Sequence, residues 1–468
     1  MSFTSYTYLL FLAAAAILVR LTSGKARENV LLGASLLFYA VWDVRYLAVL
    51  LPIGVLTYLA GHAVARDRKS LAVVLWPIAI ILVVLGVFKY SAMVAELVSL
   101  ALPAKRRLTL PALILPLGIS FFTFECISYL LDLHKGGKEL LPLRRFLLFP
   151  AFWAHMVAGP ILRIKEFVPQ LDALKTARSP DVLMGVDRIL IGFAKKLIVA
   201  NSLSGFVDQG FAGAGGNSAL DNWILALAFG LQVYFDFSSY TDIAIGSAKM
   251  VGFTFPENFN LPYHASTPTD FWNRWHMTLS RWIRDYLFFP LNLRAGKRIW
   301  LRYVTLVVVM TLVGLWHGAG LGFVLWGTWH GVLLVAHRLV QGKARDLPGW
   351  AQTALDLVGR GATLALVNAA WILFRAPTVR QAFAMLSSMF RLRGLKPAYS
   401  VNDYILVLFA IAVYLGLEPL FKRHVDRDPA TIDYARWTFW LRPLTYSIAL
   451  WLIFMYDRSN VAFIYFQF

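Results

Sequence analysis

The amino-acid sequence predicts an all-α, polytopic integral membrane protein. Hydrophobic residues fill 59% of the 468 positions and charged residues only 15%, a composition unlike that of soluble globular proteins. Apolar runs that approach the ~20 residues needed for one bilayer crossing recur along the whole chain. Several runs are shorter than a full crossing, so we expect some broken or re-entrant helices that are buried within protein.

The apolar runs predict a helical bundle of about 11–13 membrane segments. We expect one domain over residues 1–468, with peripheral helices in 1–103, a core in 104–375 and further helices in 376–468. The runs are Tyr6–Leu21, Asn29–Val41, Tyr46–Val64, Leu71–Phe88, Ala112–Leu133, Ile189–Ala200, Trp223–Val233, Tyr303–Leu315, Gly322–Val335, Ala362–Phe374, Tyr404–Leu417 and Phe439–Met455.

The basic residues gather in short loops between the apolar runs. The net charge is +19, but the loop residues do not form the single basic face typical of a nucleic-acid-binding protein. A cytoplasmic excess of Lys and Arg explains the charge instead. Lys25 and Arg27 follow the first run, and Arg66, Arg68 and Lys69 follow the third. We therefore expect both loops in the cytoplasm and the N-terminus on the extracytoplasmic side.

Two apolar segments contain residues that interrupt helices. Pro116 and Gly118 should kink or end a helix and leave backbone groups for a cavity. Glu125 follows in the same run, where it is either a structural partner for a buried arginine or a catalytic carboxylate. The segment Phe149–Arg163 contains two prolines and a glycine, which predicts a re-entrant turn.

The stretch Asp270–Tyr286 contains five charges, three tryptophans and a histidine in an otherwise apolar chain. On a continuous helix at about 100° per residue, four of the charges share one stripe and form two pairs at a spacing of four. His276 then lies on the opposite face, in an aromatic-lined environment. The tryptophans fit either an interfacial belt or the wall of a substrate site. The stripe consists of Asp270, Arg274, Arg281 and Asp285.

A second histidine, His330, follows a turn between two apolar helices. Three glycines between Trp316 and Phe323 make this turn tight. Trp326 precedes His330 by four residues and should cover the same helix face. A histidine at low dielectric tends to be neutral, and neutral imidazole can accept a proton from an attacking hydroxyl. His317 lies across the turn and is either a hydrogen-bonding residue at the helix end or a supporting catalytic group.

A polar cluster precedes these histidines in the segment Tyr234–Asp242. Asp236 and Asp242 are candidates either to pair with an arginine inside the bundle or to orient a substrate; the arginines we considered are Arg274, Arg281 and Arg284. Lys195 and Lys196 most simply mark the interfacial end of a helix. The remaining candidates for a supporting role at the site are Tyr240, Trp275 and Ser280.

Metal and covalent chemistry find little support in the sequence. The histidines lack helical metal-ligand spacing, so a zinc site would require convergence in three dimensions. Ser238 and Ser239 lie outside any G-x-S-x-G motif. Cys126 is the single cysteine, which excludes an intrachain disulfide and a cysteine-rich metal site. An acyl thioester on Cys126 is conceivable, but a small apolar packing role suits it better.

Taken together, these segments resemble the membrane-bound O-acyltransferase family, in its bacterial polysaccharide-modifying branch typified by alginate O-acetyltransferase. The similarity covers most of the chain. Glu125–Cys126 departs from the Gln or apolar residues usual there. The segments that carry the resemblance are Pro116–Phe124, Ala158–Arg163, Tyr234–Tyr240, Pro256–Asn260, Asp270–His276, Arg284–Tyr286, Trp316–Ala319, Trp326–Gly331, Trp371–Ala376 and Phe463–Phe468.

The resemblance implies a membrane-embedded O-acetyltransferase with a central cavity that is reached from both membrane faces. By this similarity His330 is the general base or proton shuttle, and His276 positions the acyl group or polarises its carbonyl. The expected donor is acetyl-CoA from the cytoplasm, with no bound cofactor. The acetyl group would pass to an exported polysaccharide, directly or through a periplasmic acyltransferase partner, at the bacterial inner membrane.

Two other functions stay open from the sequence. A related enzyme of the same family would transfer a D-alanyl or another acyl group to a cell-wall polymer. A polytopic transporter or lipid flippase would share the broken helices and buried charges but would perform no acyl chemistry.

Overall fold

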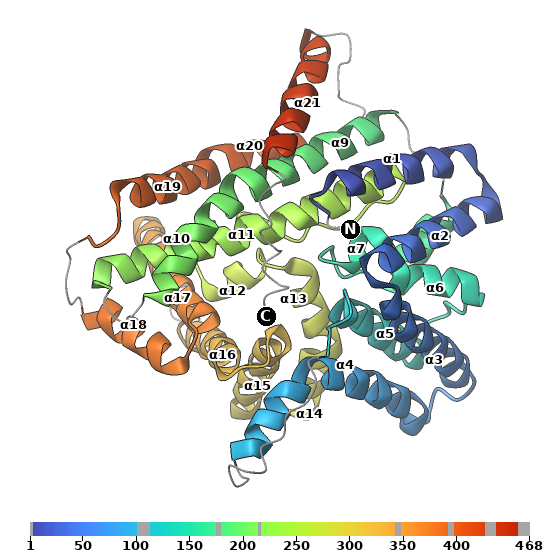
Figure 1. Cartoon of the computed structure of the whole chain (residues 1–468). Helices are drawn as coiled ribbons and strands as arrows, with labels where there is room; N and C mark the ends of the chain where they lie inside the picture. Colours follow the sequence, from blue (N-terminus) through green and yellow to red (C-terminus); the bar gives the residue numbers. More distant parts are fainter. Residues whose placement is uncertain are drawn as a thin grey trace. The chain divides into compact units, whose positions relative to one another are not determined.

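The structure is a computed structural model that describes residues 3–100, 113–174, 179–213, 217–341, 348–391, 397–425 and 437–456 (Figure 1). These residues form helices and connecting turns, with no strand among them, in agreement with the predicted all-α fold. The segment Phe463–Phe468, which contributed to the family resemblance, lies outside the described residues.

Backbone contacts divide the chain into two compact units. Unit 1 draws on Met1–Leu190, Tyr240–Pro256 and Asp428–Leu441, and unit 2 on Ile191–Ser239, Glu257–Arg427 and Arg442–Phe468. The long helices α9 and α11 contribute residues to both units. The predicted single domain over 1–468 therefore stays a prediction.

Unit 1 contains the N-terminal helices and the interrupted segments that follow them. Its helices are α1 (Tyr6–Leu21), α2 (Gly24–Asp43), α3 (Leu47–Arg66), α4 (Leu71–Leu100), α5 (Ile119–His134), α6 (Leu143–Ala151), α7 (Trp153–Met156), α8 (Ile164–Asp172) and the larger part of α9 (Ser179–Ala194).

Unit 2 contains both histidines that the sequence singles out. Three of its segments are π-helical: Lys195–Ala200, Arg284–Phe288 and Val413–Leu417. Its α-helices are α10 (Asn201–Ala212), the larger part of α11 (Ala219–Met250), α12 (Pro268–Trp272), α13 (Met277–Ile283), α14 (Phe289–Arg294), α15 (Ile299–His317), α16 (Leu321–Gln341), α17 (Gly349–Arg375), α18 (Val379–Arg391), α19 (Val401–Ala412), α20 (Glu418–Val425) and most of α21 (Trp437–Tyr456).

Within the described ranges, 6 helical stretches are long and apolar enough to cross a membrane. Our larger segment count included shorter runs, among them α1 and Leu441–Met455, which are apolar but below the length of a full crossing. The chain is thus a multi-pass membrane protein. The 6 stretches are Gly24–Arg66, Leu71–Ser99, Ile299–His317, Leu321–Gln341, Gly349–Arg375 and Val401–Val425.

The interrupted segments of unit 1 confirm the predicted helix breaks. Gly118 has a left-handed backbone (φ 68°) immediately before α5 begins. In the segment Phe149–Arg163, α6 ends at Ala151, α7 spans only four residues, and no helix resumes until Ile164. Short helices and turns in this region are buried, so their free backbone groups face protein rather than lipid.

The break at α7 supplies the partner of Glu125, which is a histidine and not the arginine we expected. The Glu125 carboxylate Oε1 lies 2.9 Å from Nδ1 of His155, and each side chain is 1% exposed. Aromatic rings of Phe149, Phe152 and Phe255 surround the imidazole. Glu125 therefore has the structural pairing that we favoured, but with a residue from the predicted re-entrant segment.

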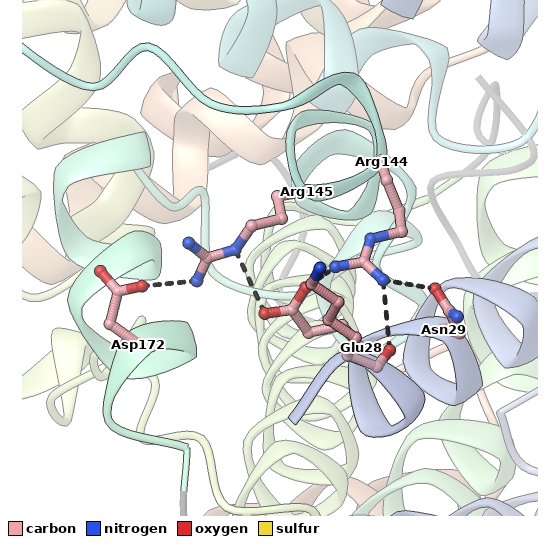
Figure 2. A network of polar contacts seen from close by, with 6 residues as sticks. Glu28, Asn29, Arg144, Arg145 and Asp172 are labelled. Atoms are coloured by element: carbon pink, nitrogen blue, oxygen red, sulfur yellow. Dashed lines mark hydrogen bonds and ion pairs between the residues drawn. The ribbon is translucent and has the colours of Figure 1, made fainter. Parts of the chain in front are cut away.

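A polar network fastens three helices of unit 1 to one another (Figure 2). Arg144 of α6 contacts Glu28 of α2 at 2.5 Å and donates to Asn29 at 2.7 Å. Arg145 lies 3.3 Å from the same glutamate and 2.5 Å from Asp172 of α8. Because Asp172 is largely exposed, its pair with Arg145 contributes only about 0–1 kcal/mol. The network chiefly fixes where the connecting segments meet.

In unit 2, α15 and α16 form an antiparallel pair in close contact (Figure 1). A Cβ on Gly327 would collide with the backbone carbonyl of Met310, and a Cβ on Gly314 with that of Phe323. Glycine at these positions lets the two backbones touch, as is common between helices in membranes. This contact fixes the rotation of α16 and thereby directs His330 toward the interior of unit 2.

We predict that Gly327→Ala lowers the thermal midpoint of the detergent-solubilised protein. Overpacking at such a contact typically costs about 1–3 kcal/mol. The matched control is Gly361→Ala in α17, where no atom lies within 4 Å of the added methyl group, so its midpoint should stay level or rise slightly. Equal midpoints for the two variants would contradict the proposed close contact.

Candidate active site

His330 lies on α16 in a cluster of aromatic rings and is 1% exposed. Its ring is 4.9 Å from Trp326 and 5.2 Å from Trp272, both edge to face, and it stacks on Phe271 at 6.0 Å. Trp326 therefore covers the same helix face, as predicted. Neither ring nitrogen has a hydrogen-bond partner among the described residues, so no hydrogen bond of the described fold occupies the imidazole.

His317 contacts the same tryptophan from the other side of the glycine turn. Its ring lies 5.0 Å from that of Trp326 and 5.6 Å from Phe374, both edge to face. Helical spacing alone does not predict this proximity, because the two histidines belong to different helices of the α15–α16 pair. The tertiary fold thus brings His317 into the aromatic cluster around His330.

The backbone around His276 corrects the predicted continuous helix. α12 ends at Trp272, α13 begins at Met277, and His276 adopts a left-handed conformation with φ 42°. The reason is a neighbouring loop that hydrogen-bonds to this turn through its backbone. The N–H of Asn260 donates to the carbonyl of Arg274, and the N–H of Met277 donates to the carbonyl of Asn258, both at 2.9 Å. These bonds replace helical ones and hold the turn open.

The His276 side chain is buried on the inner side of this turn. Its exposed fraction is 1%, and Nδ1 lies 3.0 Å from Oδ1 of Asn258. The ring meets Phe237 edge to face at 4.7 Å. Burial lowers the pKa of His276 well below its ordinary value, so the imidazole is neutral at pH 7.

An aromatic path connects the surroundings of the two histidines. Phe271 stacks on His330 and also on Trp275, the latter at 5.6 Å. Trp275 meets Phe259 at 5.2 Å, and Phe259 meets Phe237, which contacts His276, at 5.1 Å. Trp275 is therefore a buried packing residue between the surroundings of the two histidines, and its place in the wall of a substrate site stays a prediction.

The break at His276 also separates the two ion pairs of the predicted stripe. Asp270 and Arg274 pair at 2.8 Å, as the spacing of four predicts. Asp285 contacts Arg284 at 2.9 Å, in the π-helical segment after α13. The prediction of one stripe on one helix, which also included Arg281, is wrong because Asp270 and Asp285 belong to separate helical segments.

The lysines of the π-helical segment Lys195–Ala200 are buried, which overturns the interfacial role that we expected. Lys195 lies 2.6 Å from Glu418, and Lys196 lies 2.7 Å from Asp236. Tyr234 also donates to Glu418, at 2.7 Å. Asp236 thus pairs with a lysine from another segment, and not with the arginines that we considered, which supports its structural role.

The other two polar candidates have separate positions. Asp242 belongs to unit 1, where it contacts Arg188 at 3.0 Å, again a partner that we did not anticipate. Tyr240 also belongs to unit 1, and its ring stacks on Phe3 at 6.1 Å. In unit 2 the Ser280 hydroxyl donates to the backbone carbonyl of Trp275 at 3.3 Å.

A cavity of about 480 Å³ lies beside the aromatic cluster in unit 2. Trp272 lines it and contacts the ring of His330, which is not itself a lining residue. The wall is apolar apart from a few polar groups and three arginines, and it contains no carboxylate. The lining residues are Thr269, Trp272, Asn273, Met277, Leu279, Ser280, Arg281, Ile283, Arg284, Phe288, Phe289, Leu306, Val309, Met310, Val313, Leu334 and Arg338.

Two residues of this region escaped the sequence analysis. Arg338 lies two helical turns after His330, and its guanidinium sits over the ring of Phe288 at 5.4 Å. Asn258 contacts His276 from a loop 18 residues earlier. Arg338 could have been identified from the sequence, because it lies on the same predicted helix as His330. The contact of Asn258 depends on tertiary structure.

The described residues contain no cluster of three or more His, Cys, Asp or Glu side chains that could hold a metal ion. Cys126 is buried in unit 1, among the residues of α5. In unit 2 the imidazole of His330, whose ring nitrogens have no hydrogen-bond partner among the described residues, can support acid–base chemistry.

We predict that Lys196→Met destabilises the protein by about 3–5 kcal/mol, because it removes the ammonium group that lies 2.7 Å from the buried Asp236 carboxylate. The double variant Lys196→Met/Asp236→Leu should recover most of this loss, since an apolar pair often replaces a buried ion pair at little cost. Thermal denaturation of the purified variants measures both effects. A double variant no more stable than the single one would argue against the structural role of the pair.

Comparisons with known proteins agree with this arrangement. The membrane-bound O-acyltransferase family matches residues 119–353. The "probable alginate O-acetylase AlgI" of Pseudomonas aeruginosa is 32% identical, with 100% of both chains covered. The peptidoglycan O-acetyltransferase of Helicobacter pylori is 33% identical over 77% of this chain and 73% of its own.

A teichoic acid D-alanyltransferase of Bacillus subtilis is also similar, at 33% identity over 48% of this chain and 59% of its own. The family match includes both histidines, the helix break between α12 and α13, and the α15–α16 pair. The chain therefore belongs to the membrane-bound O-acyltransferase family, and it is a multi-pass O-acyltransferase.

Proposed function

We propose that this protein moves an acetyl group from acetyl-CoA at the cytoplasmic side of the bacterial inner membrane toward an exported polysaccharide. The observation that carries the proposal is His330: a buried imidazole with two uncommitted nitrogens, packed against a tryptophan that lines a cavity. The similarity to alginate and peptidoglycan O-acetyltransferases supports the acetyl group and the glycan acceptor.

In this reaction His330 is the general base. The acceptor hydroxyl oxygen attacks the acetyl carbonyl carbon, a C–O bond forms, and the C–S bond of the thioester breaks. His330 takes the proton of the hydroxyl and returns it to the leaving thiolate, so the imidazole is regenerated. A neutral ring with a free nitrogen is the form that this step requires.

The cavity in unit 2 supports an acyl-CoA as the donor. Its apolar wall suits the uncharged arm of the donor, while Arg281, Arg284 and Arg338 can neutralise phosphate groups. Trp272 lines the cavity and contacts His330, which does not line it, so we propose that this indole moves aside to let the thioester reach the base. Displacement of Trp272 would thus couple donor binding to the exposure of the base.

The route of the acetyl group beyond the membrane is also part of the proposal. The donor is inside the cell and the acceptor is outside it, so both must reach one site through the protein. The acetyl group then passes to the acceptor directly or through a periplasmic acyltransferase. The basic residues at the start of α2 (Lys25 and Arg27) and after α3 (Arg68 and Lys69) support an extracytoplasmic N-terminus.

D-alanyl transfer to a cell-wall polymer is the second candidate, favoured by the similarity to the Bacillus subtilis enzyme. Its donor would be a carrier-bound D-alanyl thioester, and the His330 chemistry would be unchanged. A transporter or flippase without acyl chemistry loses its support, because the chain belongs to a family of acyltransferases.

We predict that His330→Ala reduces transfer of labelled acetyl from acetyl-CoA to a glycan acceptor by about 10²–10⁴-fold, the usual contribution of a general base. The control is His62→Ala, which removes an imidazole that contacts the backbone of its own helix at Tyr58 and should leave the rate unchanged. Full activity in His330→Ala would refute the role of His330. Transfer of D-alanyl but not acetyl by the intact protein would select the second candidate.

We further predict that Arg338→Ala raises the KM for acetyl-CoA about tenfold with little change in kcat. One charge-assisted hydrogen bond to a phosphate contributes about 1.5–3 kcal/mol of binding energy. Arg294→Ala is the matched control, because this arginine is exposed on α14 and does not line the cavity. Steady-state kinetics on purified protein measure both constants, and equal KM values for the two variants would exclude the cavity as the donor site.

A further inference from the structure

Asn258 is fully buried and holds the turn that contains His276. Its side-chain Oδ1 lies 3.0 Å from Nδ1 of His276, 2.9 Å from Oγ1 of Thr278 and 3.2 Å from the backbone nitrogen of Thr278. Its backbone carbonyl accepts a further hydrogen bond from Met277 at 2.9 Å. The side chain of Asn258 thus holds His276 and Thr278, and its backbone carbonyl holds Met277 between them, across a helix break.

These contacts determine which nitrogen of His276 carries the hydrogen. The backbone N–H of Thr278 can only donate, so the atom of Asn258 that faces it is the carbonyl oxygen. The same oxygen faces Nδ1 of His276 and cannot donate to it. Nδ1 must therefore be the protonated nitrogen, which leaves Nε2 of the neutral ring as a hydrogen-bond acceptor.

The other ring nitrogen of His276, Nε2, is placed to bind a ligand. Nε2 of His276 is buried and has no hydrogen-bond partner among the described residues. The backbone of His276 is left-handed, a conformation that is unfavourable for a residue with a Cβ. The hydrogen bonds of Asn258 offset this cost and hold the ring in one orientation.

We propose that Asn258 is a positioning residue that fixes His276 in the Nδ1–H tautomer, so that Nε2 binds a hydrogen-bond donor of the substrate. This proposal rests on the proposed acyl-transfer function. It changes the role that the family resemblance implied for His276, because a neutral ring with a bare Nε2 cannot donate a hydrogen bond to an acyl carbonyl. The group that it binds is a hydroxyl of the acceptor or an amide N–H of the acyl donor.

The test is ¹⁵N NMR on full-length protein, labelled at histidine and reconstituted in lipid nanodiscs. The His276 signals are assigned from their loss in His276→Gln. In the wild-type protein we expect Nδ1 protonated and Nε2 unprotonated. Asn258→Ala should populate both tautomers, whereas the control Thr278→Val removes a neighbouring bond of Asn258 and should preserve the wild-type tautomer.

Kinetics then identify the bound group. The outer hydrogen-bond partners of metal-bound histidines typically contribute about 10–100-fold to activity, and we expect Asn258→Ala to lower acetyl transfer by a similar factor. A raised KM for the glycan in Asn258→Ala indicates a hydroxyl, and a raised KM for acetyl-CoA indicates an amide N–H.

Two results would overturn the proposal: a proton on Nε2 in the wild-type protein, or an unchanged Nδ1–H tautomer in Asn258→Ala. The wild-type spectrum decides the first even if the variant fails to fold. Both spectra are independent of acetyl transfer, so failure of the proposed function would appear separately, in the His330→Ala assay.

Discussion

The close approach of α15 and α16 is the constraint on which the candidate site depends. Glycines at the contact let the two backbones meet without any polar group, so the contact can form where water is absent. It sets the rotation of α16, and with it the direction of Trp326 and His330. The rings of α12 and α17 then have a fixed surface to pack against.

The buried polar groups of unit 2 fall into two kinds. Lys195, Lys196 and their carboxylate partners neutralise one another, which is how charge normally persists away from water. His330, by contrast, has no hydrogen-bond partner for either ring nitrogen in the described part of the chain. An unsatisfied buried polar group costs about 1–3 kcal/mol. A group that the surrounding packing maintains at such a cost is a strong candidate for chemistry.

At the turn that contains His276, the chain gives up favourable helical backbone and thereby orients a side chain. A continuous helix from Asp270 would have satisfied the local backbone, yet the chain breaks there and places a non-glycine residue in a left-handed conformation. Asn258 supplies the hydrogen bonds that make this arrangement stable. The break gives His276 an orientation that helical periodicity does not provide, within the aromatic environment that the sequence predicts.

The amino-acid sequence alone was enough to predict the fold class, the interrupted segments around Pro116 and Phe149–Arg163, and the two candidate site histidines. These features depend on composition, on helix-breaking residues and on local spacing, as do the Asp270–Arg274 pair and the Trp326–His330 contact. Only the three-dimensional structure reveals the partners of Glu125, Asp236 and Asp242. The same holds for the burial of Lys195 and Lys196 and for the hydrogen bond between Asn258 and His276. Each of these is a contact between segments distant in the chain, and helical periodicity relates only residues within a few turns of each other.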